Sequence, residues 1–175
     1  MRTRAVLVAF ASALVLAFAT GCGVDLGGAR TPTIDRVTLQ NDIAARFAEV
    51  GQAAQSVTCQ EDLVGEVGRT ARCDVVMSDV NSFQPVVTVT SVNGDTVDYQ
   101  LTPALSQAQL EQAVRRLVLE KSGGTVDSVA CESGLEGVIG TVAYCDVDAG
   151  GMRARRAVKV TDVSGMTMNF NLLSN

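Results

Sequence analysis

The sequence predicts an α+β fold made of two tandem repeats. Each repeat is expected to be one helix packed on a four-stranded antiparallel sheet, with an internal disulfide. Three observations support this prediction: two cysteine pairs have the same spacing, a helical apolar pattern followed by a period-two pattern occurs twice, and 47% of the residues are hydrophobic. A chain of 175 residues has room for one ordinary domain or two very small ones.

Residues 1–21 have the pattern of an export signal. Arg2 and Arg4 precede an apolar run from Ala5 to Ala19, which has the length of a signal-peptide core and is short for a membrane span. The junction Ala19-Thr20-Gly21-Cys22 resembles a bacterial lipobox. This resemblance implies that Cys22 becomes the acylated first residue of a lipoprotein, held by palmitate-type chains on the outer face of the cell membrane. A plain secretory signal that ends beside a cysteine is the alternative.

A short tether and two repeats are expected after the signal. Residues 22–36 contain Gly and Pro without apolar periodicity, so we expect a flexible tether. Residues 57–75 and 129–147 share nine of 19 positions at an offset of 72, where chance gives about one or two. We therefore expect the repeats to span residues 37–103 and 104–175.

The cysteine positions agree with this duplication. With Cys22 acylated, four cysteines remain, and export places them in an oxidising compartment. A duplicated unit has to fold by itself, so each copy should carry its own bridge. The expected bridges are Cys59–Cys73 and Cys131–Cys145. A redox pair and a zinc site are the alternatives, but the chain lacks Cys-x-x-Cys spacing and has no histidine.

Each repeat should begin with an amphipathic helix. The apolar stripe of the first is Leu39, Ile43, Phe47 and Val50, with Gly51 as the stop. In the second, Ser106-x-x-Gln109 matches a capping box and Gly123-Gly124 ends the helix. Its expected stripe consists of Leu110, Val114, Leu117 and Val118.

The rest of each repeat alternates apolar and polar residues, as strands with one buried face do. Both cysteines of each pair have the inward parity, and Leu63 and Leu135 lie in the loop between them, where they should close one end of the core. Asn93-Gly94 and Ser164-Gly165 predict hairpin turns between the last two strands.

The block Val-x-Cys-x3-Leu, then Gly, then Cys-x-Val resembles a small domain of unknown function found in mycobacterial and other actinobacterial lipoproteins. The resemblance covers about residues 37–175, twice over. Glu61 and Ser133 depart from it, because that family often has Pro after the cysteine region. The resemblance implies no catalytic residue, cofactor or ligand.

Composition excludes several kinds of site. The chain has 14 basic and 19 acidic residues, and removal of residues 1–21 takes away two arginines and no acid, which changes the net charge from −5 to −7. Such a chain is a poor nucleic-acid binder. Without histidine it has no Ser-His or Cys-His catalysis. Asp74 and Asp146 recur after the second cysteine with solvent-facing parity. We therefore expect no enzyme, metal or cofactor.

Arg153, Arg155, Arg156 and Lys159 form the one basic cluster of the sequence. Period-two geometry places Arg153, Arg155 and Lys159 on the outer face, and Arg156 on the inner side near the start of its strand. One interpretation is a contact for an acidic envelope protein, polysaccharide or anionic lipid. The other is a set of charged guards on an exposed strand edge.

The sequence favours a lipid-anchored, non-catalytic binding or interaction module whose partner and oligomeric state it does not identify. A carrier or sensor of an envelope lipid is the first alternative, which requires an apolar cavity between a helix and its sheet. A hydrolytic enzyme is the second alternative. Met152, Met166 and Met168 are expected to be core fillers and edge residues, rather than the lining of a ligand groove.

Overall fold

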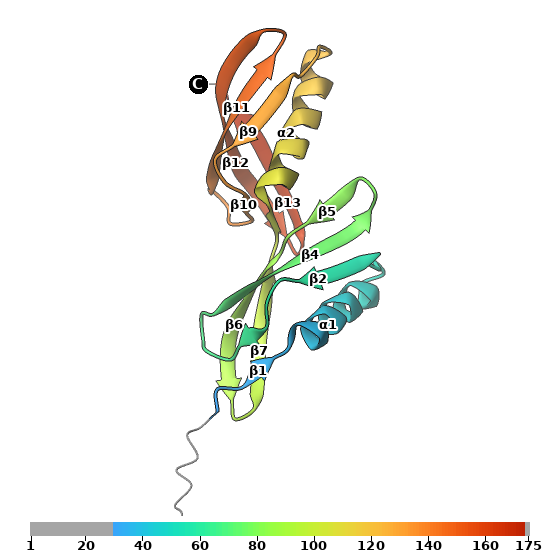
Figure 1. Ribbon diagram of the computed structural model, residues 1–175, viewed down its shortest axis with the longest axis vertical. Helices are drawn as coiled ribbons and strands as arrows, with labels where there is room; N and C mark the ends of the chain where they lie inside the picture. Colours follow the sequence, from blue (N-terminus) through green and yellow to red (C-terminus); the bar gives the residue numbers. More distant parts are fainter. Residues whose placement is uncertain (1–29, 174–175) are drawn as a thin grey trace, which may run out of the picture. The chain divides into compact units, whose positions relative to one another are not determined.

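The computed structural model describes residues 30–173, which form two repeats with similar element orders (Figure 1). The first repeat comprises β1 (Thr33–Ile34), α1 (Arg36–Glu49), β2 (Ser56–Cys59), β3 (Leu63–Val64), β4 (Thr70–Ser78), β5 (Asn81–Phe83), β6 (Val86–Asn93) and β7 (Thr96–Thr102). The second repeat comprises β8 (Ala104–Leu105), α2 (Gln107–Ser122), β9 (Ser128–Cys131), β10 (Leu135–Glu136), β11 (Val142–Ala149), β12 (Met152–Ser164) and β13 (Thr167–Leu173). A helix lies beside the sheet in each repeat.

Each repeat opens with a two-residue strand that the sequence did not indicate. β1 pairs with β3, and β8 pairs with β10, both antiparallel. The glycine that follows β3 or β10 lies close to the proline that precedes β1 or β8. The Gly65 amide donates to the Pro32 carbonyl at 2.7 Å, and the Gly137 amide donates to the Pro103 carbonyl at 2.7 Å. The flexible tether predicted over residues 22–36 is therefore wrong at its end, because Thr33–Ile34 belong to the first repeat.

Helix α1 begins at Asp35, whose side chain accepts hydrogen bonds from the amides of Val37 and Thr38 at 3.0 Å. Its apolar stripe is buried at Leu39, Ile43 and Phe47, as predicted. Val50 is the exception. It follows the last helical residue and its side chain is 70% exposed, because the chain turns away from the sheet there.

Helix α2 has the predicted capping box. Ser106 accepts from the amide of Gln109, and the Gln109 side chain accepts from the amide of Ser106. Gly123 ends the helix in the left-handed region, at φ 64°. Leu110 and Val114 are fully buried, whereas the other two members of the predicted stripe are half-buried.

The sheet of the second repeat has four antiparallel strands in the order β13-β12-β11-β9. Its inward-facing residues pack with α2 in one cluster, which includes Leu135 as predicted. The first repeat has an equivalent cluster around Leu63. Each cluster contains both cysteines of its repeat, so the bridges lie inside the cores.

The first repeat departs from a simple four-stranded sheet. Its strand order is β2-β4-β6-β7, and the additional strand β5 pairs with β4. β5 and β6 occupy the place of the continuous β12, and they are separated by Gln84 and Pro85. Proline has no amide hydrogen to give to a ladder, whereas the equivalent residue in β12 is Arg156. With the β1–β3 and β8–β10 pairs, neither repeat is only one helix on four strands.

A β-bulge occurs at the same place in both repeats. The pairing register shifts between Val89 and Ser91 in β6 and between Val160 and Asp162 in β12. One additional residue reverses the inward parity of the rest of the strand. The bulges therefore bring Val92 and Val163 against the cores, a result that strict alternation did not predict.

Candidate functional site

The predicted lipidation residue, Cys22, lies outside the described residues. Within residues 30–173, neither helix combines the length and the apolar character needed to cross a membrane. In the same part of the chain, no three His, Cys, Asp or Glu side chains are grouped so as to hold a metal ion.

Both predicted disulfides are present. Cys59 pairs with Cys73 and Cys131 with Cys145, and each bridge joins directly opposed residues of neighbouring antiparallel strands. Burial excludes solvent from all four sulfur-bearing residues. The bridges are therefore core crosslinks that join the first and second long strands of each sheet.

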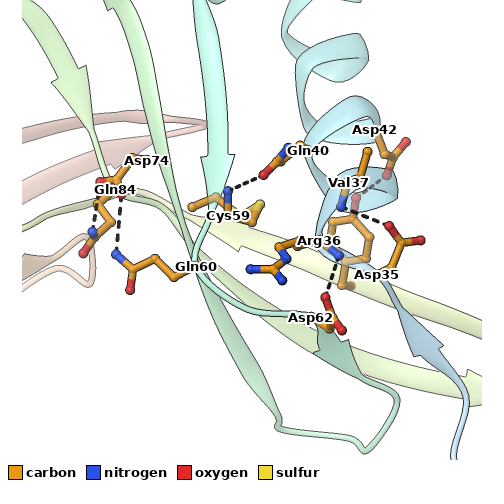
Figure 2. The surroundings of a disulfide bond; sticks show 12 residues. Asp35, Arg36, Val37, Gln40, Asp42, Cys59, Gln60, Asp62, Asp74 and Gln84 are labelled. Carbon is orange, nitrogen blue, oxygen red and sulfur yellow. Dashed lines mark hydrogen bonds between the residues drawn. A yellow bond between two sulfur atoms is a disulfide. The ribbon is translucent and has the colours of Figure 1, made fainter.

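In each repeat, a side chain of the helix accepts a hydrogen bond from the backbone amide of the first cysteine, a contact that was not predicted from the sequence. Gln40 Oε1 in α1 accepts from the amide of Cys59 at 2.9 Å, as Figure 2 shows. Glu111 Oε1 in α2 accepts from the amide of Cys131 at the same distance. Gln40 and Glu111 occupy the same position of the two repeats, 71 residues apart, and this correspondence was a signal available in the sequence.

The predicted basic face exists, but much of its charge is compensated. Arg153, Arg155 and Lys159 are exposed on the outer face of β12, and Arg156 has the inward parity and is half-buried. Arg153 lies 3.5 Å from an Asp148 carboxylate oxygen.

Arg155 has two partners on the same face. Its guanidinium pairs with Glu132 and lies 4.8 Å from the centre of the Tyr144 ring. β12 pairs with β13 only from Ala157 to Ser164, so Lys159 lies between two strands and is not a guard of a strand edge. Arg153 and Arg155 precede this pairing and face no second partner strand among the described residues, so the edge-guard interpretation stays a prediction for these two arginines. Of the three outward cations, Lys159 is the one with no carboxylate within 4.0 Å among the described residues.

The repeated aspartates differ in their contacts. Asp74 accepts from the Gln84 side-chain amide at 2.9 Å, and Asp146 lies opposite Arg155 in the β11–β12 ladder. In the acidic pair after Cys59, Asp62 accepts from the amide of Arg36 at 2.9 Å and caps the start of α1 (Figure 2). The hydrogen bonds of Asp74 and Asp62 give these two carboxylates roles in the fold.

The first repeat has a polar cluster that the second lacks. Tyr99 donates to Asp42, which pairs with Arg46 at 3.0 Å, and the Arg46 guanidinium lies 4.4 Å from the centre of the Tyr99 ring. Burial and the hydrogen bond to Asp42 raise the pKa of Tyr99 well above its ordinary value. The corresponding residues of the second repeat are Ala113, Leu117 and Phe170.

A groove of about 610 Å³ is lined by residues of both repeats. Its walls come from the end of α1, β5, residues 103–105, α2 and the β12–β13 hairpin. Apolar side chains form much of its lining, among them Met77, Phe83, Leu105, Met166, Met168 and Phe170.

This groove corrects two expectations. Met166 and Met168 pack against the cores, as predicted, but they also line this groove, which was not predicted. The groove also draws its walls from both repeats, whereas a lipid carrier was expected to need a cavity between one helix and its own sheet. Residues so distant in the sequence carry no shared pattern that could have revealed the site.

The charges at the groove differ from those of the chain as a whole. Arg46 and Arg116 line it, and none of its lining residues is Asp or Glu. The complete chain has a net charge of −5. Arg116 is exposed and donates to the carbonyl of Val80 at 3.3 Å. The groove therefore combines an apolar floor with cationic groups.

A family model described as "Domain of unknown function (DUF4333)" matches residues 14–94 and matches again over residues 97–165. No curated protein and no solved structure matches the chain.

Proposed function

The chain belongs to the DUF4333 family, with two copies of the domain, and we propose that it is a lipid-anchored, extracytoplasmic, non-catalytic binding module. The observation that supports a binding role is the groove. Its volume of about 610 Å³ lies in the range typical of small-molecule sites. Its apolar floor and cationic rim are the mixture from which such sites obtain affinity and orientation.

The anchor is proposed from the Ala19-Thr20-Gly21-Cys22 junction. Acylation of Cys22 would hold the chain at the outer face of the cell membrane. We expect Cys22→Ala to release the chain from the membrane fraction or to leave an uncleaved precursor, with both disulfides intact. Mass spectrometry of the N-terminal peptide tests this directly. A wild-type chain that keeps residues 1–21, or an unmodified Cys22, would contradict the anchor.

Binding in the groove is tested by photo-crosslinking in the producing cells. Benzoylphenylalanine is placed at Ser164 or Thr167, which line the groove, and at Asp146 on the outer face of β11 as the control. We expect adducts from the two groove positions and none from the control position. Equal labelling at all three positions, or no adduct at the groove, would contradict the proposed site.

The outer face of β12 is a second proposed contact. Arg153, Arg155 and Lys159 remain candidates for contact with an acidic envelope protein, polysaccharide or lipid, although two of them already pair with carboxylates. Benzoylphenylalanine at Lys159 tests this surface in the same cells. An adduct there that disappears in 0.5 M salt supports an electrostatic contact, and a salt-insensitive adduct contradicts it.

A carrier or sensor of an envelope lipid is the second candidate function. The groove favours it, because aromatic and methionine side chains can pack along an alkyl chain. Lipid analysis of the chain purified from its membrane separates the two candidates. A stoichiometric lipid lost on substitution Ala113→Trp supports a carrier, and an adduct with a protein at Ser164 supports an interaction module.

A further inference from the structure

We propose that the groove binds an anionic amphiphile with one long alkyl chain, the alkyl chain on the methionine and aromatic floor and the acidic headgroup at Arg116. The inference rests on the proposed binding function of the groove and specifies its ligand. The ligand class is a fatty acid or a monoalkyl phosphate.

The floor suits an alkyl chain because its side chains are apolar and deformable. Met77, Met166 and Met168 are three of the five methionines of the chain, and all three line the groove. They are only half-buried, as are Phe83 and Phe170. Thioether side chains repack around flexible apolar groups at low cost. Further coverage of these side chains would remove apolar surface from water, which is the driving force for an alkyl ligand.

The rim selects the sign of the headgroup. Nineteen acidic residues give the chain a net charge of −5, yet the groove lining contains two arginines and no carboxylate. A cationic headgroup would therefore meet like charge and no acceptor carboxylate. An anion would meet charge-assisted hydrogen-bond donors, which are about twice as strong as neutral ones.

Of the two arginines, Arg116 is available for a ligand. Arg46 is held by Asp42 at 3.0 Å and by stacking on the Tyr99 ring. Arg116 is exposed, and no carboxylate of the described residues lies within 4.0 Å of it. Its hydrogen-bond partner is the Val80 carbonyl, a neutral group that leaves the positive charge uncompensated. A planar guanidinium can bind a carboxylate or phosphate through two donors.

The test measures calorimetric binding to the exported full chain with Cys22→Ser, a substitution that removes the acylation residue. The probes are dodecanoate, dodecyl phosphate, dodecyltrimethylammonium and butyrate, each below its micelle concentration. We expect saturable 1:1 binding of dodecanoate and dodecyl phosphate, with butyrate and the cation at least about tenfold weaker. The ratio of the two anions distinguishes carboxylate from phosphate ligands.

Variants distinguish the contribution of the headgroup contact to binding from that of the apolar floor. Arg116→Gln should weaken dodecanoate binding about tenfold and remove the preference for an anion. Lys121→Gln removes the same charge from α2 outside the groove, and it should leave binding unchanged. Ala113→Trp and Thr167→Trp fill the groove from two walls and should abolish binding. Disulfide mapping and circular dichroism verify that each variant is folded.

Three results would overturn the inference: no binding of the dodecyl anions, equal binding of dodecyltrimethylammonium, or unchanged affinity in Arg116→Gln. Persistent binding in both folded groove-filling variants would place the ligand elsewhere and also overturn it. Crosslinking in cells distinguishes failure of the proposed ligand class from failure of the proposed binding function. If dodecyl anions do not bind but Ser164 crosslinks a macromolecule, the ligand class is wrong and the binding function stands. If neither occurs, both fail.

Discussion

Substitution of Gly137 by alanine tests the close approach that begins the second repeat. A Cβ on Gly137 would lie 2.6 Å from the Pro103 carbonyl oxygen and 2.6 Å from Pro103 Cγ. Carbon atoms in proteins essentially never approach so closely, and the obstacle is backbone and a rigid ring. The β8–β10 pair must therefore separate, which stretches the 2.7 Å hydrogen bond from the Gly137 amide to Pro103.

The magnitude follows from two contributions. Overpacking costs about 1–3 kcal/mol, and a weakened backbone hydrogen bond costs about 0.5–1.5 kcal/mol. We therefore expect Gly137→Ala to lower the free energy of unfolding by about 2–4 kcal/mol. Urea unfolding followed by circular dichroism, with the disulfides intact, measures this change. Hydrogen exchange should show the loss of protection in the second repeat.

Gly124 provides the control. A Cβ there would have the Ser122 hydroxyl as its nearest neighbour, at 3.7 Å, an ordinary contact. Gly124→Ala should therefore change stability by no more than about 0.5 kcal/mol. Equal urea midpoints for the two variants would refute the reasoning, because the proline contact would then impose no requirement for glycine.

Three further predictions concern stability. Reduction of the two buried disulfides should lower the free energy of unfolding of each repeat by about 3 kcal/mol. Dithiothreitol should therefore lower the urea midpoint, and an unchanged midpoint would contradict their role as core crosslinks. Because the pKa of Tyr99 is raised in the folded chain, the unfolded chain releases this proton first, so stability should fall as pH rises above about 10. The difference between the urea midpoints of wild type and Tyr99→Phe should change between pH 9 and 11, because only the wild type loses this contribution, and a constant difference would contradict the raised pKa. Simultaneous substitution of Arg153, Arg155 and Lys159 by serine should cost less than about 1 kcal/mol in urea unfolding, since the pairs are exposed, and a variant that fails to fold would show that these residues are structural.

Duplication made much of the fold predictable from the sequence. Four cysteines allow three pairings, and the repetition of the same block selected Cys59 with Cys73 and Cys131 with Cys145, the pairs that the structure contains. The helical stripes and the capping box at Ser106 were also visible, because they depend on residues near one another in the chain. The periodicity of apolar residues in a segment predicts the secondary structure of that segment.

Features that depend on a single additional residue or on distant segments were not predictable. The bulges at Thr90 and Thr161 move the residues that follow them to the opposite face of the sheet, and no residue type in the sequence marks where this happens. The groove unites Phe83 with Met166 and Met168, which are more than 80 residues away in sequence. No periodicity connects such residues, so alternation alone assigned the methionines to edges and cores.

The short strand at the start of the first repeat has a mechanical consequence if the chain is anchored at its N-terminal side. Tension applied there reaches β1 before any other described element, and β1 is held to β3 by only two residue pairs. Loss of those pairs would free the residues that precede α1, while the Cys59–Cys73 crosslink still joined β2 to β4. The first repeat would therefore yield in steps, with β1 as the weak point and the covalent bridge as the limit on extension.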